Sequence, residues 1–310
     1  MTGAAMSTGA KHGKTIDART FRSLETERKS LRFAVGSCMN DRFADSGSPV
    51  WNALASSEPD VVFLIGDTVY ADQNNWSKDD AGYLRRYTEA RDRLAWFRMP
   101  HLVPTFSTWD DHDFGVNDGD KSFVRAPFLK TLFGRWFGST ENSAWKRTFG
   151  VGSVLRAGGQ RFYFLDDRTF RDAPRQNLGK HLGSAQRDWL LADLATSSEP
   201  AWLLNGSQFF GAYQGFESYE ADHADDFKDL LAKLSKLSAP VAFVSGDIHI
   251  SELMEIEPAA LGYRTYELTS SSLHSFSVPF MDARAANPRR LASEWRYNFL
   301  SVDSRVDGTW

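Results

Sequence analysis

Two short motifs in this chain of 310 residues contain residue types that commonly bind metal ions in proteins. One is a Gly-Asp-x-x-Tyr motif with Asp67 and Tyr70, and the other is a Gly-Asp-Ile-His run with Asp247 and His249. Each follows a stretch of β-branched and aromatic residues, which is typical of a buried strand. Because metal ligands at strand ends are a common basis of hydrolytic sites, this spacing indicates hydrolysis at a metal centre.

Other polar side chains follow further predicted strands. Cys38 comes after the first of them, and three consecutive residues come after the third, namely Asp110, Asp111 and His112. Ligand sites in open α/β sheets collect outside the carboxyl ends of the strands. Four strand ends that carry Cys, Asp, Tyr and His side chains therefore predict one convergent site.

The elements that must position these residues alternate along the chain. Apolar runs predict strands at residues 31–35, 60–65, 103–109, 161–165, 201–204, 241–245, 264–268 and 296–302. Amphipathic spacing predicts helices at residues 49–56, 79–98, 123–137, 184–194 and 221–237, with Ser184 as an N-terminal cap. This alternation predicts α/β layers. We expect a flexible segment over residues 1–30 and a single domain over residues 31–310.

The composition limits the partners. With 36 basic and 40 acidic residues the formal charge is −4, which offers no field for a nucleic-acid backbone, so we expect no nucleic-acid partner. The single cysteine excludes an intramolecular disulfide. No apolar run in the first thirty residues is long enough for a signal peptide or a membrane span. We expect a soluble monomer or small homo-oligomer, cytoplasmic as written and periplasmic or secreted if a signal was removed.

The donor types around the Gly-Asp-x-x-Tyr motif suit a highly charged ion. A thiolate at Cys38 and a phenolate at Tyr70 are anionic, polarizable donors that suit ferric iron better than Mg²⁺. His249 would add an imidazole to the same ion. Asp67 could bridge this ion and a second one, because a carboxylate has two oxygens.

The remaining candidates predict a second ion and a reaction. Asp111 and Asp247 offer only oxygen and would suit Ca²⁺ or Mn²⁺. Two nearby cations would clamp a phosphoryl group and generate a hydroxide that attacks phosphorus in line. His112 would donate a hydrogen bond or a proton to the phosphate or its leaving oxygen. Arg168 and Arg171 either hold the nonbridging oxygens or form structural ion pairs with nearby aspartates.

Four further candidates lie after predicted strands or in the aspartate-rich turn: Asp110, Asn117, Asn205 and Gln208. Asp110 either takes part in the site or only braces its turn by hydrogen bonds. Asp118, next in the same turn, is predicted to be a solvated turn residue.

Five motifs in order resemble those of the PhoD-like alkaline phosphatases, which belong to the calcineurin-like metallophosphoesterases. They are Gly36-Ser37-Cys38 and the segments at residues 66–70, 109–113, 165–171 and 245–249. The resemblance runs from about residue 32 to residue 273. It implies a four-layer α/β/β/α sandwich of two packed mixed sheets, with the metals at the strand ends. It also implies Fe³⁺ bound through Cys38, Asp67, Tyr70 and a later histidine, beside Ca²⁺ or another divalent ion such as Mn²⁺, Co²⁺ or Zn²⁺.

The functional hypothesis is hydrolysis of phosphate esters, chiefly phosphomonoesters at neutral to alkaline pH. Phosphodiesterase or phosphotriesterase activity is the close alternative, because the same clamp serves either and only the pocket walls decide. A non-haem iron protein without hydrolytic turnover is the alternative from another class. Where longer relatives carry a segment that shapes the pocket, this chain has residues 215–219, which leaves its substrate preference open.

Overall fold

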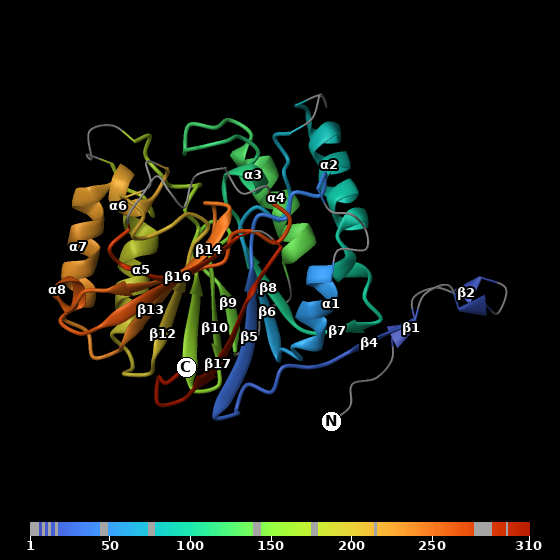
Figure 1. Ribbon diagram of the computed structural model, residues 1–310. Coiled ribbons are helices and arrows are strands. Elements are labelled where there is room, and N and C mark those ends of the chain that lie inside the picture. Colours follow the sequence, from blue (N-terminus) through green and yellow to red (C-terminus); the bar gives the residue numbers. More distant parts are fainter. Residues whose placement is uncertain are drawn as a thin grey trace.

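In the computed structural model two β-sheets pack face to face, and helices cover their outer faces (Figure 1). The structure describes residues 6–7, 10–11, 14–15, 18–43, 49–73, 78–138, 144–174, 179–213, 216–275, 287–295 and 297–310. The layers confirm the predicted four-layer sandwich of two mixed sheets.

The larger sheet has eight strands, and its central strands are parallel. Their order is β16 (Arg290–Trp295), β14 (Ile250–Ile256), β15 (Thr265–Thr269), β13 (Val241–Ser245), β12 (Ala201–Leu204), β11 (Gln160–Phe164), β10 (Ser153–Ala157) and β9 (Trp145–Arg147). From β11 through β12 and β13 to β15 the neighbours run parallel, while the outer strands are antiparallel. Every residue of β11 and β12 is buried, as expected for strands covered on both faces.

The smaller sheet carries the first half of the predicted site. Its order is β17 (Leu300–Arg305), β5 (Ser30–Gly36), β6 (Val61–Ile65) and β8 (Thr105–Thr108). β5, β6 and β8 are parallel, and β17 pairs antiparallel with β5. A Cβ atom added at Gly246, after β13, would lie 2.9 Å from the carbonyl oxygens of Ile65 and Gly206. The carboxyl ends of strands from both sheets therefore meet at one place.

The helices fall on both sides of the sandwich. They are α1 (Pro49–Ser56), α2 (Asp80–Arg93), α3 (Asp111–Phe114), α4 (Ala126–Phe137), α5 (Ser184–Leu194), α6 (Tyr219–Asp222), α7 (Ala224–Leu234) and α8 (Pro258–Leu261), with a 3-10 helix at Ala95–Arg98. α5 and α7 bury leucine and phenylalanine side chains against the larger sheet, and α1 packs on the smaller one (Figure 1). α2, α3 and α4 share a third apolar cluster around Trp109.

Aromatic side chains join the two sheets. Phe33 in β5 is completely buried, and its ring centroid lies 5.2 Å from that of Phe63, 5.4 Å from that of Phe162 and 5.1 Å from that of Trp202. Phe63 belongs to the smaller sheet, whereas Phe162 and Trp202 are register partners in the larger one. This core holds the two sheets together below the strand ends that carry the site.

The predicted helices lie where the structure has helices, but some of them differ from the observed helices in length or number. The helix at residues 49–56 is confirmed with the same bounds. The helix predicted over residues 79–98 ends at Arg93 and is followed by the 3-10 helix. The helix predicted over residues 221–237 is two helices, α6 and α7, because His223 between them has the non-helical angles φ −137° and ψ 48°.

The prediction that Ser184 caps α5 is wrong. Gly183 is the N-cap residue, and Ser184 is the first residue of the helix. Gly183 has φ 69°, in the left-handed region that glycine adopts readily. A Cβ atom there would lie 2.5 Å from Cβ of Phe170, so the close packing excludes a side-chain cap at this position.

Two strand predictions, at residues 201–204 and 241–245, match their strands in full. Among the described strands of the larger sheet, the sequence did not predict β9, β10, β14 and β16. The strand predicted over residues 296–302 begins later, at Leu300, and Arg296 lies outside the described residues. β14 was missed because its sequence contains Glu252, which is buried in the structure and pairs with Arg290 of β16, whose Nε lies 2.6 Å from Oε2 of Glu252.

Short strands precede the sandwich: β1 (Met6–Ser7), β2 (Ala10–Lys11), β3 (Lys14–Thr15) and β4 (Ala18–Phe21), which pairs in parallel with β7 (His101–Leu102). Arg22 and Arg28 each approach Oδ1 of Asp60 at 2.6 Å. The division at residue 30 stays a prediction. In the described part of the chain, no helix is long and apolar enough to cross a membrane.

Replacing Phe33 by alanine should lower the free energy of unfolding by about 3–5 kcal/mol, because it leaves a cavity between the sheets. Urea denaturation followed by circular dichroism measures this difference. Val124→Ala is the matched control, since Val124 is 87% exposed and its truncation should change stability by less than about 0.5 kcal/mol. Equal losses in both variants would contradict the assignment of Phe33 to the core.

Candidate metal centre

Four predicted metal ligands have unusual backbone angles. Cys38, Asp67, Asp247 and His249 have φ values of 56°, 52°, 75° and 57°, in the left-handed region. A residue with a side chain costs about 1–3 kcal/mol in such a conformation, and these conformations concentrate at functional sites. Each of these residues follows a strand of the sandwich within a few positions, so the chain turns sharply where each strand ends.

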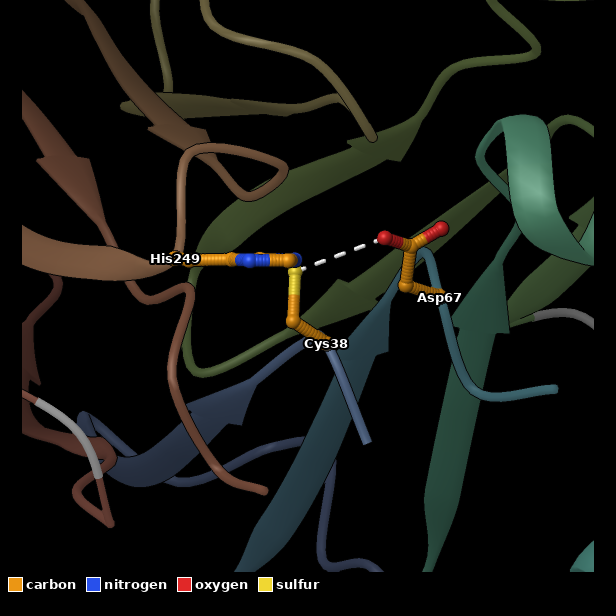
Figure 2. Close-up of side chains that lie close together, drawn as sticks. All are labelled: Cys38, Asp67 and His249. Carbon is orange, nitrogen blue, oxygen red and sulfur yellow. Dashed lines mark hydrogen bonds between the residues drawn. The ribbon is translucent and has the colours of Figure 1, made fainter. Parts of the chain in front are cut away.

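A first group of donors, here called the thiol cluster, contains Cys38, Asp67, Tyr70 and His249. Ligand atoms of Cys38, Asp67 and His249 all lie within 4.8 Å of one another, and Figure 2 shows these side chains together. The Cys38 thiol lies 3.5 Å from Oδ2 of Asp67, and the Tyr70 hydroxyl lies 3.3 Å from Nε2 of His249. The structure thus brings the four residues predicted for the first ion into one group.

A second group, here called the carboxylate cluster, contains Asp67, Asp111 and His112, whose ligand atoms again lie within 4.8 Å of one another. Asp67 is common to both clusters. Oδ2 of Asp111 accepts a hydrogen bond from the Asp118 amide at 2.8 Å, whereas its buried Oδ1 has no partner within the described chain. Asp247 lies near enough for Glu217 and Asp111 to raise its pKa.

The raised pKa values of several of these donors show that too little positive charge lies nearby to stabilise their deprotonated forms. Burial raises the pKa of Cys38 to about 12, although hydrogen bonds with Ser271 and Ser37 lower it. Burial, followed by nearby acidic groups, raises the pKa values of Tyr70 and Asp247 well above their usual range. Burial also raises the pKa of Asp67, more than the charge of His112 lowers it. A multivalent cation would favour the deprotonated form of every one of these groups. The residues therefore fit a metal centre.

His112 is held from two sides. Its ring stacks on Tyr70 with 4.1 Å between centroids, and its Nδ1 lies 2.8 Å from Oδ1 of Asp72. Burial lowers the pKa of His112, but Asp67, Asp111 and Asp72 together raise it to about 10. A cation bound at Asp67 and Asp111 would offset part of this increase. The Asp72 contact orients Nδ1, which leaves Nε2 for a ligand.

Arg168 and Arg171 are completely buried and share one carboxylate. Nη2 of Arg168 lies 2.5 Å from Oε2 of Glu217, and Nη2 of Arg171 lies 2.5 Å from Oε1 of the same side chain. Arg168 also donates from Nε to Oδ1 of Asp110 at 2.6 Å, and Arg171 lies 2.7 Å from Asp222. Both arginines therefore have ion-pair partners, so their contact with a phosphate stays a prediction.

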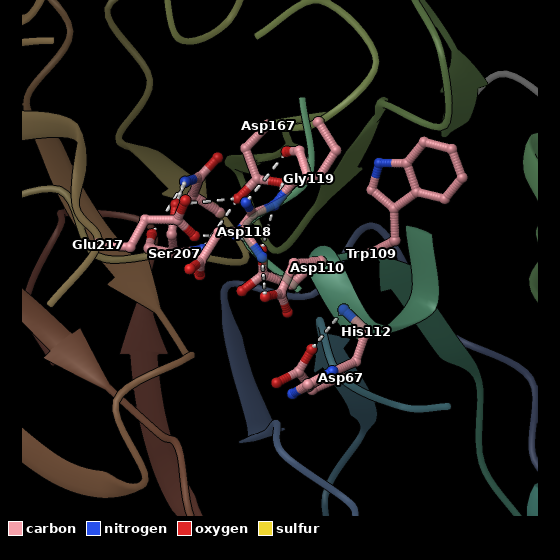
Figure 3. Close-up of polar contacts among 12 residues, drawn as sticks. Asp67, Trp109, Asp110, His112, Asp118, Gly119, Asp167, Ser207 and Glu217 are labelled. Atoms are coloured by element: carbon pink, nitrogen blue, oxygen red, sulfur yellow. Dashed lines mark hydrogen bonds and ion pairs between the residues drawn. The ribbon is translucent and has the colours of Figure 1, made fainter. Parts of the chain in front are cut away.

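The Glu217 carboxylate lies between the arginines and the predicted metal ligands. Ligand atoms of Asp111, Asp118 and Glu217 lie within 4.8 Å of one another, and Figure 3 shows Glu217 and Asp118 beside Asp110. Asp118 is exposed, which agrees with the prediction of a solvated turn residue. It nevertheless belongs to a third group of possible metal ligands, together with Asp111 and Glu217.

The other candidates are placed less centrally. Asp110 is buried against Arg168, and its Oδ2 has no partner among the described residues. Asn117 is exposed. Asn205 donates to the carbonyl of Ser207 at 2.9 Å, and Gln208 donates to Glu252 at 2.7 Å. These hydrogen bonds hold Asn205 and Gln208 to residues outside the two clusters.

Sequence reasoning missed several residues that support the site. Ser271 accepts a hydrogen bond from the His249 amide at 2.7 Å and lies 3.1 Å from the Cys38 sulfur. Ser275 lies 3.2 Å from the Tyr70 hydroxyl and donates to the carbonyl of Cys38 at 2.8 Å. A signal existed, because the serine-rich run after the predicted strand at residues 264–268 is another strand end with polar residues.

The sandwich with its site at the strand ends is a fold of the metallophosphoesterase type. It superimposes on the solved structure of PhoD with a TM-score of 0.73 at 15% sequence identity, covering 93% of this chain and 67% of that chain. A structure of TT1561 from Thermus thermophilus matches with a TM-score of 0.40 at 11% identity, covering 89% of this chain and 99% of that one. No protein-family model and no curated protein matches the sequence. The likeness to PhoD confirms the fold that the sequence resemblance implied.

Asp67→Asn should remove most of the metal bound by the purified protein, because Asp67 belongs to both clusters. Cys38→Ala should remove metal from the thiol cluster alone. Elemental analysis of protein purified without chelators measures the metal per chain, and Asp188→Asn is the control because that side chain is 69% exposed. Unchanged metal content in Asp67→Asn would contradict the placement of the centre.

Proposed function

We propose that this protein is a metal-dependent phosphoester hydrolase that acts chiefly on phosphomonoesters at neutral to alkaline pH. The observation that carries the proposal is the position of Asp67, shared by two clusters of different donor chemistry. Besides Asp67, one cluster offers a thiol, a phenol and an imidazole, and the other offers the Asp111 carboxylate beside His112. The likeness of the fold to that of PhoD supports this proposal, because both clusters lie at strand ends of the two-sheet sandwich.

The two clusters suit two different ions. The thiol cluster would hold Fe³⁺, and the carboxylates Asp67, Asp111 and Asp247 would hold Ca²⁺ or another divalent ion such as Mn²⁺, Co²⁺ or Zn²⁺. When bound, the two ions would supply positive charge to the phosphoryl oxygens and acidify the water that attacks phosphorus in line.

The side chains around the clusters would handle the proton and the substrate charge. His112, with its pKa raised and its ring held by Asp72, would give a proton to the leaving oxygen of the ester. Arg168 and Arg171 would orient the nonbridging oxygens by charge-assisted hydrogen bonds. Arg171 supports this role because its Nε and Nη1 are buried without a hydrogen-bond partner among the described residues.

A specific observation favours phosphodiesters as the second candidate substrate. Glu217 already neutralises part of the charge of the arginine pair. A phosphodiester carries one negative charge at neutral pH, whereas a phosphomonoester carries nearly two. An arginine pair whose charge is partly neutralised favours the more highly charged monoester less strongly over the diester.

The first test compares a phosphomonoester with a phosphodiester between pH 7 and pH 10, using protein with its native metals. We expect faster hydrolysis of the monoester, and loss of hydrolysis in Asp67→Asn because that variant loses both ions. Faster hydrolysis of the diester would select the second candidate. Stoichiometric metal without hydrolysis of either ester would refute the proposal and favour a non-haem iron protein without turnover.

His112→Asn should lower kcat by about 10²–10⁴-fold, because it removes the proton donor. In the wild-type enzyme, kcat should fall as pH rises through the pKa of His112, since only the protonated ring donates. This alkaline decline should be absent in His112→Asn, and Asp72→Asn should move it to lower pH. A pH profile of kcat with the same alkaline decline in His112→Asn would exclude this role.

A further inference from the structure

The Glu217 carboxylate has the geometry of a bound anion. Each of its two oxygens lies 2.5 Å from a different guanidinium, one from Arg168 and the other from Arg171. Two nonbridging oxygens of a phosphoryl group are recognised by arginine in the same way. The side chain is 11% exposed, so it fills this position at the edge of the buried site rather than reaching into solvent.

The arginines have other partners besides Glu217. Arg168 is paired with Asp110 through Nε and through the same Nη2 that contacts Glu217, and Arg171 is paired with Asp222. Losing the Glu217 charge would therefore leave each buried guanidinium with an ion pair. This makes Glu217 replaceable as a partner, in contrast to a carboxylate that alone balances a buried charge.

The surroundings of Glu217 are otherwise unfavourable for a carboxylate. One of its carboxylate oxygens lies within 4.8 Å of carboxylate oxygens of Asp111 and Asp118. Burial and then the charge of Glu217 raise the pKa of Asp247. The same carboxylate therefore touches the arginine pair on one side and faces the carboxylate cluster on the other. An anion that lies between two guanidiniums and the residues suited to a metal ion has the location that a substrate phosphate needs.

We propose that Glu217 occupies the position of the substrate's phosphoryl oxygens and is displaced when a phosphate binds, which makes it a specificity-determining residue. The inference rests on the proposed phosphoesterase function. Glu217 competes with the phosphate for Arg168 and Arg171, so it lowers the affinity of the site for the phosphate dianion. The same competition weakens the binding of the phosphate product to the enzyme.

Isothermal titration calorimetry with inorganic phosphate tests this inference on the metal-containing protein. Glu217→Gln keeps the size of the side chain and removes its charge, so phosphate should bind on the order of tenfold more tightly than to the wild type. Glu220→Gln is the matched control, because Glu220 lies three residues away and pairs with Arg289 at 3.0 Å. Its affinity for phosphate should equal that of the wild type.

The outcomes separate the inference from the proposed function. Unchanged phosphate affinity in Glu217→Gln, with ester hydrolysis intact in the wild type, overturns the inference alone. Weaker phosphate binding together with loss of metal in Glu217→Gln assigns the residue to the metal ligands and also overturns it. Absence of both ester hydrolysis and phosphate binding in all three proteins overturns the proposed function as well. Glu217→Ala, checked for folding by circular dichroism, should reproduce the gain in affinity.

Discussion

The site depends on the close approach of strand ends from two different sheets. At Gly206 a Cβ atom would meet Asp110 Cβ at 2.6 Å, and at Gly246 it would collide with the Ser37 hydroxyl. Only glycine permits this contact without movement of the chain. The aromatic core below fixes the distance between the sheets, and the glycines allow their upper edges to converge. Donors from distant parts of the chain therefore gather around Asp67.

The close approach of the strand ends buries several ionisable side chains near one another, which is electrostatically unfavourable. Burial raises the pKa values of the Cys38 thiol, the Tyr70 phenol and the carboxyl groups of Asp67 and Asp247. Three of these residues, Cys38, Asp67 and Asp247, also have left-handed backbone angles. Within the described chain, Arg168, Arg171 and His112 supply positive charge, but the arginines lie with Asp110, Glu217 and Asp222. A cation that binds the folded state alone stabilises that state, so the strain and the buried charge are tolerable in the metal-containing protein.

Much of the fold and the centre of the site could be predicted from local sequence. Apolar runs that end in Asp, Cys or His identified the strand ends, because burial and strand periodicity produce a pattern of apolar and polar residues that is visible in the sequence. Asp72 and Glu217 could not be identified in this way, since their contacts depend on where separate loops meet in space. The same holds for β14, where the buried Glu252 pairs with Arg290, which lies in the neighbouring strand of the sheet but is far away in the sequence. The capping error at Ser184 arose from packing against Phe170, which local sequence does not show.

Under the proposal that both clusters hold ions, Asp67 has a further consequence for how the protein acquires them. Because one carboxylate belongs to both clusters, occupancy of either cluster changes the charge and orientation of a ligand in the other. The two binding equilibria are then linked by a reciprocal coupling free energy, and neither affinity is a constant of one site alone. An ion of the wrong kind in one position would alter selectivity in its neighbour. The order in which the ions arrive thus becomes a property of the folded chain as well as of the ions available to it.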